Sequence, residues 1–226
     1  MPLDLGRIQG ICFDVDGTLS DTDNQWVTRV ERLLLPWSRL FPQREVYPFA
    51  RRLVMEMVTP GNLAYELLDR LHLDDDAGRL LSALSRLKKD CPGHFLLIPG
   101  VVEMLADVQQ RYQLSIVSAR GERSTRAFIE QFELDQYFLA VATALTCTHT
   151  KPFADPIVWA AERMGIPASA CLMVGDTTAD IRAGKAAGAQ TAGVLCGFGT
   201  QRELLRAGAD LIIDSTVDLA AILGGG

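Results

Sequence analysis

Carboxylates follow two of the apolar runs in this sequence. Asp14 and Asp16 come after "IQGICF", and Asp176 and Asp180 come after "ACLMVG". Carboxylates that converge on one place repel one another unless a cation lies between them. Such a cluster is suited to bind a hard divalent ion that prefers oxygen ligands, above all Mg²⁺. If the fold brings the two runs together, these residues predict a magnesium site.

A hydroxyl and an amine follow two further apolar runs. Ser118 ends "LSIVS", and Lys151 stands in "THTKPFADP", after the run "LAVAT". Beside a metal ion, both groups are suited to holding an anion that the metal also contacts. Phosphate fits best, because Mg²⁺ usually binds through one or two carboxylates together with phosphate oxygens.

The pattern of the chain predicts the elements that position these residues. From residue 98 onward, short apolar runs alternate with helical patterns, and this alternation predicts a Rossmann-like parallel α/β sheet with helices on both faces. Ligands of such sheets bind beyond the carboxyl ends of the strands, where the polar residues stand. Strands are expected at 8–13, 114–118, 139–143, 170–175, 191–195 and 210–214, with helices such as 101–112 and 178–188 between them.

Residues 20–97 have a different pattern. Segments such as "VTRVERLLLPWSRLF" and "NLAYELLDRLHL" carry apolar residues at helical spacing, and no segment reads as a strand. We therefore expect an α/β core domain at 1–19 and 98–226. An all-α cap domain of four-helix type, at 20–97, is expected to be inserted after the first strand.

Composition excludes several classes of protein. The 226 residues include 22 Lys and Arg against 28 Asp and Glu, so the chain lacks the basic footprint of a nucleic-acid binder. No apolar stretch is long enough to span a bilayer, and the first residues resemble neither a signal nor a transit peptide. Five scattered cysteines indicate a reducing compartment, with Cys12, Cys171 and Cys196 expected to be buried. We expect a cytoplasmic protein without nucleic-acid or membrane partners, as a monomer or weak homodimer.

Four short motifs carry a resemblance to a known family. In chain order, "FDVDGTL", the serine after the second strand, "KP" and "GDTTAD" resemble the motifs of the haloacid dehalogenase superfamily. The resemblance covers the whole chain, and the helical insertion is similar to the cap of that family. More narrowly, the chain is similar to the phosphoglycolate phosphatase-like hydrolases. This implies a Mg²⁺-dependent phosphatase that hydrolyses a small organophosphate monoester through an aspartyl-phosphate intermediate.

The resemblance implies a role for each motif residue. Asp14 is expected to be the nucleophile, and Asp16 the general acid and base. Ser118 and Lys151 are expected to bind the transferring phosphoryl group. Asp14, the backbone carbonyl of Asp16, and Asp176 are expected to ligate the metal.

Some positions leave alternatives open. Many relatives carry Asn after the motif serine, whereas this chain has Ala119 and then Arg120. The phosphate contact at Ala119 is expected to be largely through backbone N–H, so it survives the change. Arg120 either reaches the substrate or is a solvated arginine at a helix start. Asp180 either orients Lys151, supports the metal or begins a helix, and His149 either faces the site or is solvated.

The motif residues also bear on the type of reaction. The dehalogenases of this family lack the second aspartate, and Asp16 argues against that reaction because a leaving halide needs no proton. The phosphonate hydrolases use a lysine early in the cap, whereas here Lys88 and Lys89 stand at its far end. A sugar-phosphate mutase and a non-catalytic regulatory protein on the same scaffold remain alternatives to the phosphatase.

Overall fold

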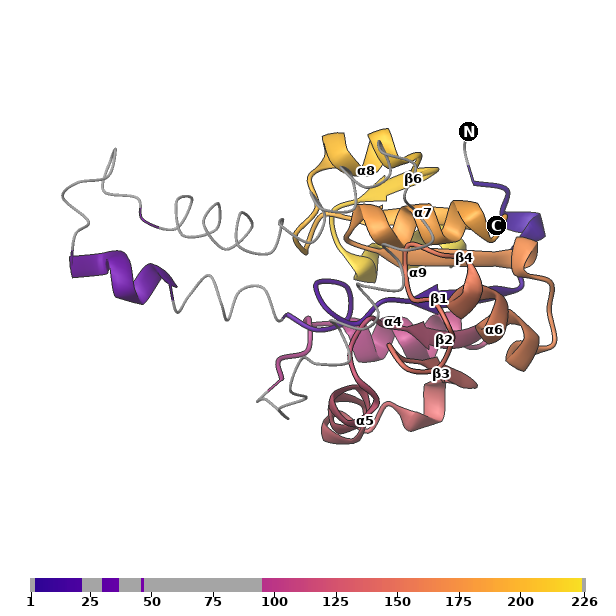
Figure 1. Ribbon diagram of the computed structural model, residues 1–226, viewed down its shortest axis with the longest axis horizontal. Coiled ribbons are helices and arrows are strands. Elements are labelled where there is room, and N and C mark those ends of the chain that lie inside the picture. The colour runs from indigo at the N-terminus through magenta and orange to yellow at the C-terminus, as the bar shows by residue number, and fades with distance from the viewer. Residues whose placement is uncertain (1–2, 22–29, 37–45, 47–94, 225–226) are drawn as a thin grey trace.

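Helices surround a six-stranded parallel sheet (Figure 1). The computed structural model describes residues 3–21, 30–36, 46 and 95–224. Its strand order is β3-β2-β1-β4-β5-β6, the doubly wound order of Rossmann-like folds. The predicted fold class of the core is therefore confirmed. The strands are β1 (Gly10–Phe13), β2 (Gln113–Val117), β3 (Ala140–Ala142), β4 (Cys171–Gly175), β5 (Gln190–Val194) and β6 (Leu211–Ile213).

Helices follow the strands in the predicted alternation. The strand bounds differ from the prediction by one or two residues, as is usual for element ends. The helix expected at 101–112 ends at Val108, and its last predicted turn is a non-helical turn. The helices are α4 (Val101–Val108), α5 (Glu122–Gln131), α6 (Asp155–Met164), α7 (Thr178–Ala186), α8 (Gln201–Ala207) and α9 (Leu219–Gly224). Single 3₁₀ turns lie at Leu5–Arg7, Asp135–Tyr137, Ala168–Ala170 and Thr216–Asp218.

Side chains of the central strand pack on both faces of the sheet. Ile11 and Phe13 belong to a cluster that includes residues of α4, α5 and α9. Cys12, between them, belongs to a second cluster with residues of α6 and α7. Successive side chains of a strand point to opposite faces, so these clusters place helices on both sides, as predicted. Cys12 and Cys171 are buried as expected, but the prediction was wrong for Cys196, which is only partly buried.

The ends of the three central strands lie level with one another. β1 pairs with β2 on one side and with β4 on the other, so Phe13 lies beside both Ile116 and Val174. After β1, the chain adds β2 and β3 on one side of this strand, and it then returns to add β4 on the other side. This is the switch point at which doubly wound sheets bind their ligands.

The predicted cap at 20–97 lies almost entirely outside the described residues. Within it, residues 30–34 are helical, in keeping with the helical pattern there. Residues 95–97 return to the core, where the N–H of Asp21 donates to the carbonyl of Leu96 at 2.8 Å. No helix among the described residues is long and apolar enough to cross a membrane.

Candidate active site

The three central strands end in polar residues at one edge of the sheet. β1 leads into Asp14, β2 into Ser118 and β4 into Asp176. The backbone ladder extends past β1, since the N–H of Asp14 donates to the carbonyl of Val174 at 2.9 Å. Lys151 comes from the loop between β3 and α6. The structure therefore brings these strand ends together at one edge of the sheet, as the sequence predicted.

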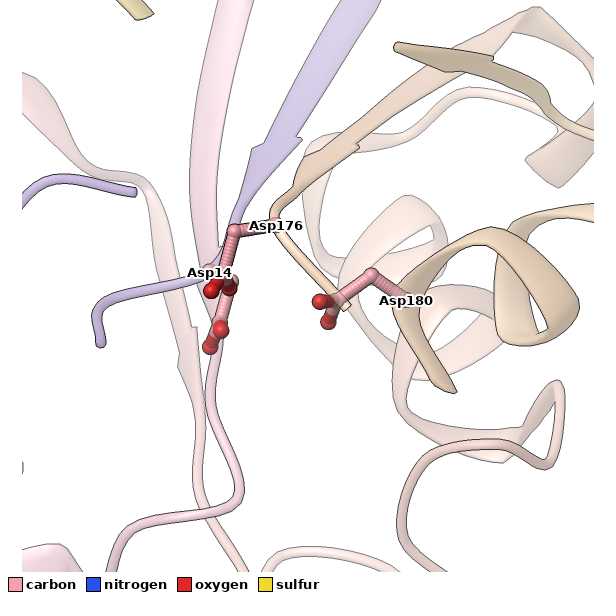
Figure 2. Close-up of side chains that lie close together, drawn as sticks. All are labelled: Asp14, Asp176 and Asp180. Carbon is pink, nitrogen blue, oxygen red and sulfur yellow. The ribbon is translucent and has the colours of Figure 1, made fainter. Parts of the chain in front are cut away.

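Three buried carboxylates gather at this edge (Figure 2). Asp14, Asp176 and Asp180 each offer one oxygen, and these oxygens lie within 4.8 Å of one another. Figure 2 shows the first two side by side at the strand ends and the third facing them from the start of α7. Asp176 and Asp180 are fully buried, and Asp14 is 6% exposed. In the part of the chain that the structure describes, this cluster is the group spaced to hold a metal ion.

Lys151 neutralises part of this cluster. Its Nζ lies 2.7 Å from Oδ1 of Asp14 and 2.6 Å from Oδ1 of Asp180. The side chain is 5% exposed, so this lysine lies inside the protein and not at its surface. A cation between two buried carboxylates offsets the repulsion that burial makes strong.

Burial and nearby charges shift the pKa values of Asp14 and Lys151. Burial raises the pKa of Asp14 to about 7, although the charge of Lys151 acts in the opposite direction. Burial lowers the pKa of Lys151, but the charges of Asp14 and Asp180 outweigh it and hold that pKa above its ordinary value. Lys151 is therefore a cation at neutral pH, and Asp14 loses its proton near neutrality when no metal ion is bound.

Asp180 has two of the roles that the sequence left open. Its Oδ1 accepts a hydrogen bond from Lys151, which orients the amine. Its Oδ2 accepts hydrogen bonds from the N–H and the hydroxyl of Thr177, at 2.9 and 2.6 Å, in a capping box that begins α7. A Cβ on Gly175 would lie 2.3 Å from Cγ of Asp180, so the strand must end in glycine for α7 to approach this closely.

The loop after β5 holds the carboxylate of Asp176. The N–H of Phe198 donates to Oδ2 of Asp176 at 2.7 Å. A Cβ on Gly197 would lie 2.2 Å from the same oxygen. Glycine at this position therefore allows the loop backbone to pack against the carboxylate. Neither of these two loop residues was singled out from the sequence, because the hydrogen bond joins residues that are 22 positions apart in the chain.

Asp16 forms an ion pair instead of joining the cluster. Both of its carboxylate oxygens accept hydrogen bonds from Arg120, one from Nε at 2.5 Å and one from a terminal guanidinium nitrogen. The side chain of Arg120 is 11% exposed, and that of Asp16 is 34% exposed. The alternative of a solvated arginine is wrong, because this guanidinium is mostly buried. The sequence pattern carried no signal for this pair, which joins the segment after β1 to the segment after β2.

The remaining predicted residues lie in the segment after β2 and in the loop before α6. Ser118 is buried, and its hydroxyl accepts a hydrogen bond from the N–H of Arg120 at 3.1 Å. Ala119 is exposed. His149 is half-buried in the loop before α6, with its Nδ1 3.0 Å from Oδ1 of Asp155.

The donors at this edge fit a hard divalent cation. Carboxylate oxygens are the ligands that Mg²⁺ prefers, and usually one or two protein carboxylates suffice. Both oxygens of Asp180 already accept hydrogen bonds, from Lys151 and Thr177. Asp14 and Asp176 are therefore the carboxylates best placed to ligate an ion.

Comparison with known proteins agrees with this geometry. The family model described as "Haloacid dehalogenase-like hydrolase" matches residues 11–194. The "Probable phosphatase IndB" of Dickeya dadantii is 32% identical over 212 residues, covering 91% of this chain and 89% of that protein. The N-acetylmuramic acid 6-phosphate phosphatase of Pseudomonas putida is 25% identical over 223 residues, covering 96% of each chain.

Solved structures share the fold at lower identity. A haloacid dehalogenase-like family hydrolase of Streptococcus pneumoniae superposes with a TM-score of 0.65 at 19% identity, covering 96% of this chain and 99% of the other. CbbY from Rhodobacter sphaeroides, in complex with phosphate, gives 0.60 at 21% identity, covering 94% and 96%. The family match spans most of the chain, from the strand before Asp14 to the end of β5. This protein belongs to the haloacid dehalogenase-like hydrolase family.

Proposed function

We propose that this protein is a Mg²⁺-dependent phosphatase that hydrolyses a small organophosphate monoester through an aspartyl-phosphate intermediate. The observation that carries the proposal is the buried carboxylate of Asp14, which pairs with Lys151 and lies near Asp176 at the switch point of the sheet. The names of its relatives support it, since they include phosphoglycolate phosphatases and an N-acetylmuramic acid 6-phosphate phosphatase.

The first half of the reaction transfers the phosphoryl group to the protein. A carboxylate oxygen of Asp14 attacks phosphorus in line, and the bond from phosphorus to the ester oxygen breaks. Asp16 gives its proton to that leaving oxygen, so the alcohol departs neutral. Ser118 and Lys151 hold the equatorial oxygens, over which the charge of the transition state spreads.

The second half releases phosphate. Asp16, now a carboxylate, takes a proton from a water molecule as the water attacks phosphorus. The bond from phosphorus to the Asp14 oxygen breaks, which restores the carboxylate and forms inorganic phosphate. Asp180 keeps Lys151 oriented toward the phosphoryl group throughout, because its hydrogen bond fixes the amine.

A bound Mg²⁺ would supply charge neutralisation for the carboxylates and the phosphate. Asp14 and Asp176 would hold it, with the backbone carbonyl of Asp16 as a third ligand implied by the family resemblance. The raised pKa of Asp14 fits this role, because a carboxylate buried among other carboxylates gains most from a cation.

The cap is proposed to occupy residues 20–97 and to close over this edge. The core would then be 1–19 and 98–226, with the cap excluding bulk water during the reaction. We further propose that the enzyme works in the cytoplasm on a small phosphorylated metabolite, as a monomer or weak homodimer. Neither a nucleic acid nor a membrane is proposed as a partner.

The test is hydrolysis of p-nitrophenyl phosphate and of a panel of phosphorylated metabolites, with Mg²⁺ and with EDTA. We expect turnover that requires Mg²⁺ and is abolished in Asp14→Asn. Asp214→Asn is the matched control, because this aspartate also follows a strand of the sheet but is exposed. Acid-quenched protein should carry one phosphoryl group on Asp14, found by peptide mass spectrometry.

Other outcomes would refute the proposal. Activity of Asp14→Asn at the level of the Asp214→Asn control would exclude Asp14 as the nucleophile. Return of the phosphoryl group to a sugar phosphate, instead of release to water, would identify a mutase. Absence of Mg²⁺-dependent turnover on every ester, with a stoichiometric protein partner, would identify a regulatory protein.

A further inference from the structure

The ion pair between Arg120 and Asp16 blocks the role proposed for Asp16. Both carboxylate oxygens accept hydrogen bonds from the guanidinium, so the carboxylate faces Arg120. Proton transfer requires the acid to lie within hydrogen-bond reach of the atom that receives the proton. The pair must therefore open before the chemistry can proceed.

The backbone of Arg120 is held on both sides. Its N–H donates to the hydroxyl of Ser118 at 3.1 Å, and its carbonyl accepts from the N–H of Ala144 at 2.9 Å. These bonds tie the residue to the end of β2 and to the loop after β3. The arginine is thus anchored at the phosphate-binding end of the sheet.

Aromatic rings hold the guanidinium itself. Its central carbon lies 4.8 Å from the ring centroid of Phe95 and 5.8 Å from that of Phe128. The Gln131 side chain fixes Phe95, donating to its carbonyl at 2.9 Å and accepting from its N–H at 3.4 Å. Since both the backbone and the guanidinium of Arg120 are held by these contacts, Asp16 is the partner that moves when the pair opens.

Opening such a pair is costly unless another anion replaces the carboxylate. A mostly buried guanidinium that loses its carboxylate partner loses both hydrogen bonds and charge compensation. A planar guanidinium is matched in shape to a carboxylate or a phosphate, which it binds through two parallel hydrogen bonds. The natural replacement for Asp16 is therefore a second oxyanion.

The location of the pair indicates which oxyanion this is. The transferring phosphoryl group is assigned to Ser118, Lys151 and the metal site. Arg120 instead accompanies Asp16, which serves the leaving oxygen. An anion that takes the place of Asp16 would therefore belong to the leaving part of the substrate.

We propose that Arg120 is a specificity residue that binds a second anionic group, a carboxylate or phosphate, on the leaving part of the substrate. By taking the place of Asp16, this group releases the acid for proton transfer. The inference rests on the proposed phosphatase function and narrows its substrate class to phosphate monoesters with an acidic leaving part. Esters with a neutral leaving part leave Asp16 in the ion pair and react slowly.

The test compares two esters of similar size, 2-phosphoglycolate and 2-hydroxyethyl phosphate. For the wild type, we expect kcat/KM to be at least about tenfold higher on the acidic ester, the scale of a charge-assisted hydrogen bond. In Arg120→Gln, kcat/KM on the acidic ester should fall at least about tenfold, while that on the neutral ester should rise because Asp16 is no longer held. Arg126→Gln is the matched control, since this arginine pairs with Glu122 on the exposed face of α5 and should leave the preference unchanged.

Binding gives a readout that does not depend on turnover. In the Asp14→Asn background, calorimetric titration with Mg²⁺ should show tighter binding of 2-phosphoglycolate than of 2-hydroxyethyl phosphate. Adding Arg120→Gln should remove this difference, with inorganic phosphate bound equally by both proteins. Should Arg120→Gln fail to fold by circular dichroism, Arg120→Lys keeps the charge but loses the two-pronged geometry, and it should lose most of the preference.

Two outcomes would overturn the inference. An equal loss on both esters in Arg120→Gln would assign the guanidinium to the transferring phosphoryl group or to the support of Asp16. A wild type that does not distinguish the esters, in turnover or in binding, would refute the second anionic group. Neither result would remove the phosphatase activity, whereas an inactive wild type that still binds the acidic ester more tightly would refute the function and keep the specificity.

Discussion

Replacing Lys151 with Met tests whether one buried cation holds the carboxylate cluster together. Met has a similar length and no charge, so Lys151→Met removes the charge with little change in packing. The substitution leaves the carboxylates of Asp14 and Asp180 facing each other without the amine that bridges them at 2.7 and 2.6 Å. Removing one partner of a buried ion pair costs about 3–5 kcal/mol of the free energy of unfolding.

The size of this loss depends on pH, and the structure gives its sign. In the metal-free protein the pKa of Asp14 is raised to about 7, above its ordinary value near 4. Between those values the folded protein keeps a proton that the unfolded chain has released, so the free energy of unfolding falls as pH rises. Lys151 lowers the pKa of Asp14, so its removal raises that pKa further. The variant should therefore lose more stability at about pH 8 than at about pH 5, by at most about 1.4 kcal/mol, because pH 8 lies about one unit above the pKa of Asp14 in the wild type.

The assay is urea unfolding followed by circular dichroism, in EDTA, at both pH values. Lys185→Met is the matched control, because Lys185 pairs with Asp210 at the surface and should contribute about 1 kcal/mol or less. A loss for Lys151→Met no larger than that of the control would show that the cluster does not depend on this amine. A loss that is the same at both pH values would show that Asp14 does not titrate as its burial requires.

Three further predictions concern the metal and the elements that hold it. Mg²⁺ should raise the Tm more at about pH 8 than at about pH 5 in differential scanning fluorimetry, because protons compete with the metal for Asp14; an equal rise would contradict the assigned ligand. Gly197→Ala should weaken Mg²⁺ binding in calorimetry by about tenfold or more, because its Cβ would lie 2.2 Å from Oδ2 of Asp176, whereas Gly224→Ala, with open space around it, should not. Thr177→Val should cost about 1 kcal/mol in urea unfolding because α7 loses its cap, and a change near zero would show that the cap is dispensable.

The sheet could be predicted from the sequence because its strands are buried on both faces. Strands such as β4 read as continuous apolar runs, and their alternation with helices implied parallel pairing. The polar residues directly after these runs then had to lie at one edge. This is why Asp14, Ser118 and Asp176 could be assigned to the same site from their positions alone.

These patterns could not predict side-chain contacts between elements that are distant in sequence. Lys151 and Asp180 stand 29 residues apart, and the sequence left open whether they meet. The ion pair of Arg120 with Asp16 requires that the arginine side chain be buried, and hydrophobic periodicity does not predict the burial of a single arginine. The cap at 20–97 stays a prediction, since it falls almost entirely outside the described residues.

The central position of β1 has a consequence for how the chain folds during synthesis. This strand is made first, yet its two neighbours, β2 and β4, follow about 100 and about 160 residues later. Pairing over such separations carries a large loop-closure cost, and folds dominated by it form slowly. The apolar segment at 10–13 must therefore stay unpaired until most of the chain has left the ribosome, at risk of aggregation in the meantime. Because β1, β2 and β4 are brought together late, the catalytic edge that they form is among the last parts of the core to form.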